Sequence, residues 1–157
     1  MKRWLIAFVG AAAMAFSVGA AAQNTGFYAG LDIGTADFGN EDDTAFRLSG
    51  GFQFHRHIAA EVGVARLFDK GGVEVTALEV AAVGSLPLAN QFSVFARIGI
   101  ANIDIETGAG SRDKTELLLG IGAQYDFTRN LGLRVQWQRY ESEPEVDLLS
   151  VGAVWRF

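Results

Sequence analysis

Few side chains in this sequence have the types and spacings that do chemistry. His55 and His57 form a His-x-His pair, which can bind a metal ion, but no third ligand stands near them in the sequence. Cysteine is absent, which excludes thiol enzymes, disulfide scaffolds and cysteine-ligated metals. A polar tight turn is the simpler interpretation of the two histidines, so we expect no metal site and no cofactor.

Carboxylates and arginines offer the other candidates for chemistry. Glu61 and Glu79 could act as catalytic carboxylates with Arg97 as their partner, but pairing of these charges inside a protein explains them more simply. The acidic residues between positions 37 and 43 could attract a divalent cation, although a solvated loop is the simpler interpretation. No glycine-rich phosphate loop lies between a strand and a helix. We therefore expect no enzyme activity.

The elements that carry these residues are predicted to be strands. From residue 26 onward, apolar residues alternate with polar residues or glycines, and a period of two indicates β-structure. With their flanking residues the strands reach about 10 residues, the length that a tilted membrane-spanning strand needs. The alternating segments cover residues 27–34, 46–54, 58–65, 78–83, 92–101, 116–127, 131–138 and 149–157. The pattern predicts an all-β fold, an eight-stranded antiparallel up-and-down transmembrane β-barrel.

The predicted connections alternate between two kinds. Those at residues 55–57, 87–91 and 128–130 are tight, whereas those at 36–44, 69–72, 104–114 and 141–145 are polar and longer. Short turns at one end and longer loops at the other are typical of outer-membrane barrels. An even number of strands then places both ends of the barrel domain on the short-turn, periplasmic side.

The two faces of each strand differ in polarity. In a membrane barrel the apolar face meets lipid and the polar face lines the lumen, which in an eight-stranded barrel side chains can fill. The inward acids and bases nearly balance, which indicates ion pairs, because an unpaired buried charge is costly. Inward glycines would make room for the long side chains. The predicted core of this lumen network is Arg47, Glu61, Glu79, Arg97 and Arg134.

Aromatic residues gather at the short-turn ends of the strands, on the lipid-facing register. Such a ring is typical of the girdle at a membrane interface. The predicted girdle comprises Phe27, Phe54, Phe92, Phe127, Trp155 and Phe157. A soluble eight-stranded barrel of the lipocalin kind is the alternative. The girdle favours the membrane, and so does the scarcity of lysine, since only Lys70 and Lys114 follow residue 22.

Arg66 and Arg139 fall in the lipid-facing register near the outer ends of their strands. Arginine binds phosphate with bidentate geometry, so these residues are possible contacts for lipopolysaccharide phosphates. A β-bulge that turns them inward, or simple snorkelling of the side chain to the interface, is the alternative.

Composition and the N-terminal segment indicate the class of the protein and its cellular location. The chain has 157 residues and a net charge of −5, which argues against a nucleic-acid partner, and 50% hydrophobic residues, too many for a disordered chain. A basic start, an uncharged apolar run and Ala20-Ala21-Ala22 form the pattern of a secretory signal peptide. We predict a signal peptide at residues 1–22 and one barrel domain at residues 23–157.

Several segments resemble the small outer-membrane β-barrel superfamily, the OmpA-like transmembrane domain and its relatives. They are GFYAGLDIG at 26–34, AEVG at 60–63, GSLPL at 84–88, FARIG at 95–99 and VGAVWRF at 151–157. The last segment resembles the signal read by the outer-membrane assembly machinery, which here would consist of Val151, Ala153, Trp155 and Phe157. The resemblance implies an outer-membrane location, a monomer, and lipid, lipopolysaccharide and the assembly machinery as partners.

Three functions remain open at this point. The leading prediction is a structural or envelope-integrity role for a barrel with a filled, charge-paired lumen. The first alternative is a narrow or gated pore for ions or small solutes, which requires the charge network to switch partners. The second is a surface interaction protein that acts through its outer loops, above all the loop at residues 104–114.

Overall fold

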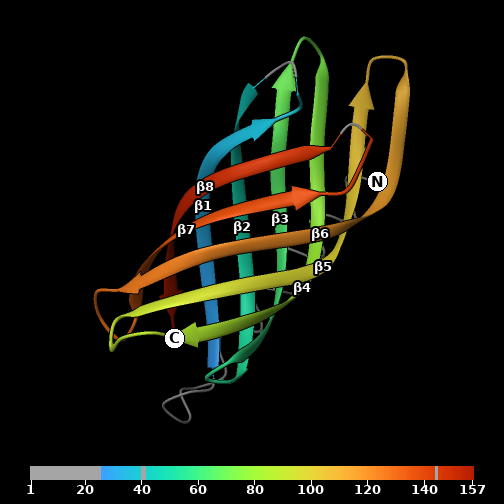
Figure 1. The fold of residues 1–157 in the computed structure, drawn as a ribbon. Helices are drawn as coiled ribbons and strands as arrows, with labels where there is room; N and C mark the ends of the chain where they lie inside the picture. The colour runs from blue at the N-terminus through green and yellow to red at the C-terminus, as the bar shows by residue number, and fades with distance from the viewer. Residues whose placement is uncertain (1–25, 40–41, 144) are drawn as a thin grey trace.

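The computed structural model describes residues 26–39, 42–143 and 145–157, so the predicted signal peptide at residues 1–22 lies outside the described residues. Each strand pairs antiparallel with the next, and β8 pairs with β1, which closes the barrel (Figure 1). The predicted eight-stranded fold is confirmed. The strands are β1 (Gly26–Asp37), β2 (Asp42–His55), β3 (Ile58–Lys70), β4 (Val73–Pro87), β5 (Phe92–Thr107), β6 (Gly110–Asp126), β7 (Leu131–Tyr140) and β8 (Val146–Arg156).

The polar face of each strand points into the barrel, as the alternation predicts. On β1, Asp32 is 1% exposed, whereas its neighbours Leu31 and Ile33 are 61% and 48% exposed. The same contrast holds on β5, where Arg97 is buried between the exposed Ile98 and the exposed Ala96. On these two strands the exposed aliphatic side chains therefore face outward, and the charged Asp32 and Arg97 face the lumen.

Three of the four outer connections are shorter than predicted, because the strands continue beyond the apolar band, whereas the connection at residues 141–145 has its predicted bounds. The predicted contrast in connection length is therefore wrong: the strand bounds leave two to five residues at this end and two to four at the other. The predicted loop at residues 104–114 is wrong: β5 runs to Thr107 and β6 begins at Gly110. Isoleucines 103 and 105 alternate there with Asp104 and Glu106, so the period of two persists through the charged residues. The predicted loop at 69–72 reduces to Gly71 and Gly72, whose positive φ angles of 63° and 82° suit a tight hairpin turn.

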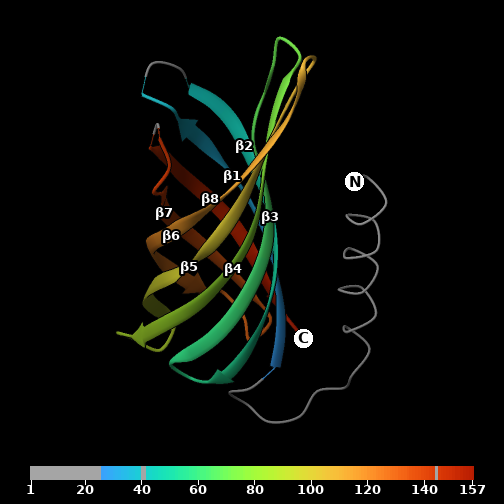
Figure 2. The same ribbon diagram turned by 90° about the vertical axis from the view of Figure 1, so that its right-hand side faces the viewer.

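Two hairpins rise above the rest of the barrel, β3–β4 and β5–β6 (Figure 2). Pairing of β6 with β7 begins only at Leu118 and Tyr140, so the part of β6 before Leu118 has β5 as its neighbour and extends past the end of β7. Among the residues that the structure describes, no helix is long and apolar enough to cross a membrane.

The buried side chains form two apolar clusters inside the barrel. The larger one, which we call the outer plug, lies toward the long hairpins and consists of Ala36, Ala45, Ala65, Leu67, Val75, Ala77, Ala81, Ala101, Ile103, Leu118, Tyr140, Val146 and Leu148. The smaller one lies toward the short turns and consists of Tyr28, Ala59, Val83, Phe95 and Val154. The buried charges lie between these two clusters along the strands.

Candidate functional site

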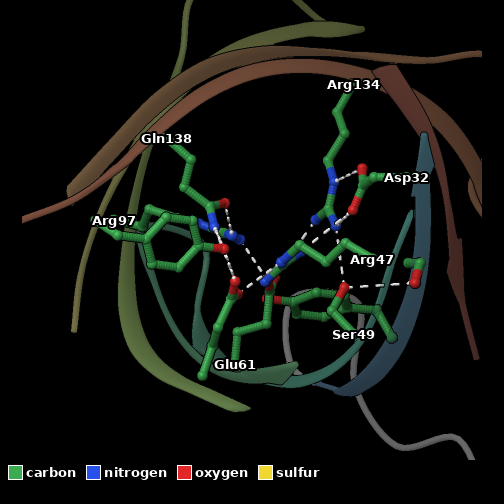
Figure 3. Close-up of polar contacts among 11 residues, drawn as sticks. Asp32, Arg47, Ser49, Glu61, Arg97, Arg134 and Gln138 are labelled. Atoms are coloured by element: carbon green, nitrogen blue, oxygen red, sulfur yellow. Dashed lines mark hydrogen bonds and ion pairs between the residues drawn. The ribbon is translucent and has the colours of Figure 1, made fainter. Parts of the chain in front are cut away.

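Arg47 stands at the centre of a buried charge network inside the barrel (Figure 3). It extends from β2 and contacts a carboxylate with each of its three nitrogens. Its Nε donates to Glu79 Oε2 at 2.7 Å, its Nη2 to Glu61 Oε1 at 2.5 Å and its Nη1 to Asp32 Oδ2 at 3.2 Å. All four side chains are at most 1% exposed, so these ion pairs are shielded from solvent.

Two further arginines complete the network. Arg134 on β7 makes a bidentate pair with Asp32 on β1, with Nε–Oδ1 and Nη2–Oδ2 distances of 2.8 and 2.5 Å. Its Nη2 also donates to Ser49 Oγ at 3.0 Å, and its Nη1 reaches Glu61 at 3.4 Å. Arg97 on β5 donates to Glu61 and, through Nη1, to Gln138 Oε1 at 2.9 Å.

Two tyrosines close the network on its two sides. Tyr28 donates its hydroxyl proton to Glu61 Oε2 at 2.8 Å, and Tyr140 donates to Glu79. Gln138 adds a hydrogen bond from its Nε2 to Glu79 Oε1 at 2.9 Å. The three arginines and three carboxylates balance in charge, which is the condition for burying ions at tolerable cost.

Glycines on neighbouring strands make room for these side chains. A Cβ added at Gly30 would lie 2.6 Å from Arg134 Nη2, and one at Gly152 would collide with the Asp32 carboxylate. The expected role of inward glycines is therefore seen at these two positions. The network links β1, β2, β3, β4, β5 and β7, and glycines of the other strands face it.

The network separates two unlike spaces. On the outer side, Leu67, Leu118 and Leu148 of the outer plug are at most 1% exposed. On the periplasmic side a cavity of about 1450 Å³, which we call the vestibule, reaches up to Glu61, Arg97 and Arg134. The small apolar cluster lines its walls, and Arg56, Arg129 and the Arg156–Asp126 pair line its mouth. The lumen is thus closed on one side and open on the other.

All five residues of the predicted lumen network lie in it, but the prediction omits Ser49 and four larger members. Asp32 and Gln138 belong to the predicted inward face without being assigned to the network core. Tyr28 precedes Gly30 and Asp32 on that same face. Tyr140 follows Gln136 and Gln138 at intervals of two, so extending the alternation by one step beyond the predicted strand would have placed it inside.

Arg66 and Arg139 point outward near the outer ends of β3 and β7, and each has acidic neighbours. Arg66 Nη2 lies 2.9 Å from Glu74 Oε1. Arg139 binds Asp147 through Nε at 2.7 Å and Nη2 at 3.0 Å, and its guanidinium lies 5.1 Å from the Trp137 ring. A bulge does follow Arg66, between Arg66 and Phe68, but Arg66 remains outward and 55% exposed.

The predicted girdle residues lie at the short-turn end, where most of them are exposed on the outside. Trp155, Phe127 and Phe157 are 50%, 51% and 54% exposed. Rings also pair along this rim, with centroid distances of 4.8 Å for Phe27 and Phe52 and 5.1 Å for Tyr125 and Phe127.

The histidines and the acidic run have structural partners. His57 lies in the turn after β2, where its Nδ1 is 3.0 Å from the Ser85 carbonyl oxygen, and the His55 ring lies 5.4 Å away. Asp37 and Asp43 accept hydrogen bonds from the backbone amides of Gly39 and Thr44. Glu41, which belongs to the acidic run, lies outside the described residues. Within the described ranges, no three His, Asp or Glu side chains are grouped so that they could hold a metal ion.

Several solved structures with this architecture are barrels of bacterial outer-membrane proteins. The N-terminal β-barrel domain of Pseudomonas aeruginosa OprF aligns with a TM-score of 0.67 at 15% identity, over 85% of this chain and 99% of that chain. Ail of Yersinia pestis aligns with a TM-score of 0.60 at 18% identity, over 85% and 97%. OprG of Pseudomonas aeruginosa aligns with a TM-score of 0.63 at 10% identity, over 85% and 97%. These identities show the common fold alone.

Comparison by sequence identifies the family of the chain. No curated protein matches the chain. The family model of the outer membrane protein β-barrel domain, however, matches residues 8–157. The chain belongs to this family of β-barrel proteins, and it resides in the bacterial outer membrane.

Proposed function

We propose that this protein is a non-enzymatic structural barrel that contributes to the integrity of the outer membrane while keeping its own lumen sealed. The observation that supports this proposal is the presence of two barriers in series. Between the vestibule and the outer end, a permeating ion meets first the charge network and then the outer plug.

The charge network acts as a staple across the barrel. Ion pairs from Arg47 and Arg134 connect strands that are not neighbours in the wall, such as β2 with β4 and β1 with β7. Losing one partner of a buried pair leaves an uncompensated charge, which costs about 3–5 kcal/mol. The network therefore resists any deformation of the barrel that would separate its strands.

The outer plug weakens the alternative of a gated pore. If the arginines exchanged carboxylate partners, an ion would still have to pass Leu67, Leu118 and Leu148, which offer it no polar contact. A conducting state requires that both layers open together. Rearrangement of the charge network alone is thus not expected to produce a pore.

Contact with lipopolysaccharide is part of the proposed role. Arg66 and Arg139 lie outward at the outer rim, where arginine suits phosphate groups. Glu74 and Asp147 already bind these side chains, so a phosphate would have to share them or displace a carboxylate. The expectation is weaker lipopolysaccharide binding by the Arg66→Ala/Arg139→Ala double variant, measured with the purified barrel.

Conductance in planar bilayers tests the seal. We expect no channel events from the folded wild-type protein or from Arg97→Ala, because the outer plug remains in place. Combining Arg97→Ala with Leu67→Ala and Leu118→Ala should produce events if the two layers act in series. Discrete channels from the wild type would overturn the proposal in favour of the pore.

A second candidate, a surface interaction protein, is favoured by the β5–β6 hairpin. Residues 110–116 of β6 extend past β7, and a strand edge of this kind can accept an additional strand. Deleting the gene should make the envelope sensitive to detergent. Rescue by a barrel that lacks residues 105–112 would support the structural role, whereas failure of that variant alone would support the hairpin as the acting part.

A further inference from the structure

An apolar groove crosses the outside of the barrel from β4 to β8. It has a volume of about 760 Å³. Its floor contains the small residues Gly84, Ala96 and Ala123, and the bulkier Leu86 and Trp137 stand beside them. Nothing lies within 4 Å of the position that a Cβ would take at Gly84, so the space above the floor is open.

The groove runs along one row of paired residues, which begins with the small Gly84 and Ala96 and continues through larger side chains, while Ala123 lies two positions after Ile121 on β6. Gly84 pairs with Ala96, Ala96 with Ile121, Ile121 with Trp137, and Trp137 with Leu149. Gly84 lies close to the periplasmic end of β4, whereas Trp137 and Leu149 lie near the outer ends of β7 and β8. The row therefore climbs from the periplasmic side into the membrane.

The dimensions of the row suit one acyl chain. Four spacings of about 4.8 Å between neighbouring strands span about 19 Å. Because barrel strands tilt by about 35–45°, the row rises by less than its length. The result is comparable to half of the hydrocarbon core, about 15 Å, which is the depth that one lipid leaflet occupies.

The periplasmic end of the groove carries groups that can meet a headgroup. His57 lines it, and the ring of His57 is fixed because Nδ1 donates to the Ser85 carbonyl oxygen. The Nε2 atom is then the nitrogen available to an outside ligand: it accepts in the neutral ring and donates to a phosphate oxygen in the imidazolium. His55 and Arg56 share this turn next to the groove, where Arg56 also lines the vestibule mouth, and residues 55–57 contain no carboxylate. The turn thus complements a negative charge.

We propose that this groove is a specific site for an anionic phospholipid of the periplasmic leaflet. The phosphate lies at His57, and one acyl chain lies along the floor formed by Gly84, Ala96 and Ala123. The site is separate from the lumen, so it stands or falls independently of the sealed-barrel function. An apolar groove on the outside of a barrel could instead bind a second copy of the barrel, and the test below distinguishes this outcome.

Trp137 provides a direct reporter because it lies in the groove, whereas Trp155 lies on β8 outside it. In the Trp155→Phe protein without residues 1–22, which removes Trp4, reconstituted in phosphatidylcholine, we expect phosphatidylglycerol with brominated acyl chains to quench Trp137 at least twofold more strongly than brominated phosphatidylcholine at the same mole fraction. In the Trp137→Phe protein, Trp155 should show no such preference.

Variants then test each half of the site. Ala96→Leu fills the groove and should abolish the preference, whereas Ala153→Leu, another outward alanine that does not line it, should not. His57→Gln should reduce the preference, whereas Arg129→Gln in a different periplasmic turn should leave it intact. All four variants lie at outward or turn positions, and a heat-dependent gel shift verifies that each has folded.

Three results would overturn the proposal. Equal quenching by the two lipids would mean annular contact only. Loss of the preference in Arg139→Gln but not in His57→Gln would place the anionic lipid at the outer rim, beside the other end of Trp137. A dimer detected by native mass spectrometry, together with shielding of Trp137 from both brominated lipids, would assign the groove to a second copy.

Discussion

The two halves of the lumen are built from the same alternating strands but have opposite properties. The outer half is packed, and Ala65, Ala77 and Leu118 in it are completely buried. In the periplasmic half, Val83 and Phe95 line the vestibule of about 1450 Å³. Inward alternation alone therefore does not determine whether a barrel is filled. The packing between the inward side chains of facing strands does.

The charge network lies between the two halves, with the outer plug on one side and the vestibule on the other. Glu61 faces the vestibule and receives a hydrogen bond from Tyr28, while Glu79 on the opposite side receives one from Tyr140 of the outer plug. Ion pairs in this layer are shielded, but those at the vestibule mouth are near water. Equal substitutions in the two environments should consequently have unequal effects on the free energy of unfolding.

The largest effect is expected at Glu61, which contacts all three arginines of the network. Glu61→Gln keeps the shape of the side chain but leaves three cations with two carboxylates, so it should lower the free energy of unfolding by about 3–5 kcal/mol. Urea unfolding of the barrel in lipid vesicles measures this change.

The matched control is Asp126→Asn at the vestibule mouth. It removes the carboxylate 2.8 Å from Arg156, in a pair whose side chains are 28% and 30% exposed. Exposed pairs contribute at most about 1 kcal/mol, so a small loss is expected. Similar losses in Glu61→Gln and Asp126→Asn would refute the difference in shielding between the two layers.

The next effect compares two inward valines of β4 with the same burial. Val75 packs in the outer plug at 8% exposure, and Val83 lines the vestibule at 7%. Val75→Ala should leave a cavity among packed neighbours and lower the free energy of unfolding by about 2 kcal/mol. Val83→Ala only enlarges an existing space and should cost about 1 kcal/mol. Equal losses would mean that the vestibule wall is as tightly packed as the plug.

Much of this comparison could be predicted from the sequence. The period of two gave the strand count, the inward faces and all five arginines and glutamates of the predicted network, because each inward residue type differs sharply from its outward neighbours. Which charges pair could not be predicted, since Arg134 reaches Asp32 across 102 positions of the chain and depends on closure of the barrel. The packing of the outer plug could not be predicted either, because alanine occurs on both the lumen-facing and the lipid-facing sides of a strand.

The outer hairpins were misjudged for a related reason. Charged residues at 104–114 suggested a loop, yet β5 keeps one apolar residue in two through Ile103 and Ile105, and its pairing with β6 continues to Thr107 and Gly110. This extension brings two like charges together, because the strand register places Asp104 directly opposite Asp113. Like charges at such a position destabilise a strand pair.

The smallest predicted effect concerns this hairpin, which continues the outer half beyond the end of β7. Partial burial, together with the carboxylates of Asp113 and Glu106, raises the pKa of Asp104. A raised pKa means that ionisation disfavours the ordered hairpin, so order is greatest when Asp104 is protonated. It should decrease as the pH rises from about 4, the ordinary pKa of aspartate, through the raised value.

Asp113→Asn separates this effect from a general response to acid. Removing the opposing charge should stabilise the hairpin at pH 7 by a few tenths of a kcal/mol, within the range of about 0.2–1 kcal/mol for cross-strand pairs. Hydrogen exchange of the amides at residues 103–114 should then depend less on pH than in the wild type, whereas Asp126→Asn at the vestibule mouth should leave that dependence unchanged. If Asp113→Asn also leaves it unchanged, the Asp104–Asp113 pair does not limit the hairpin, and the outer half is held up to its tip by packing alone.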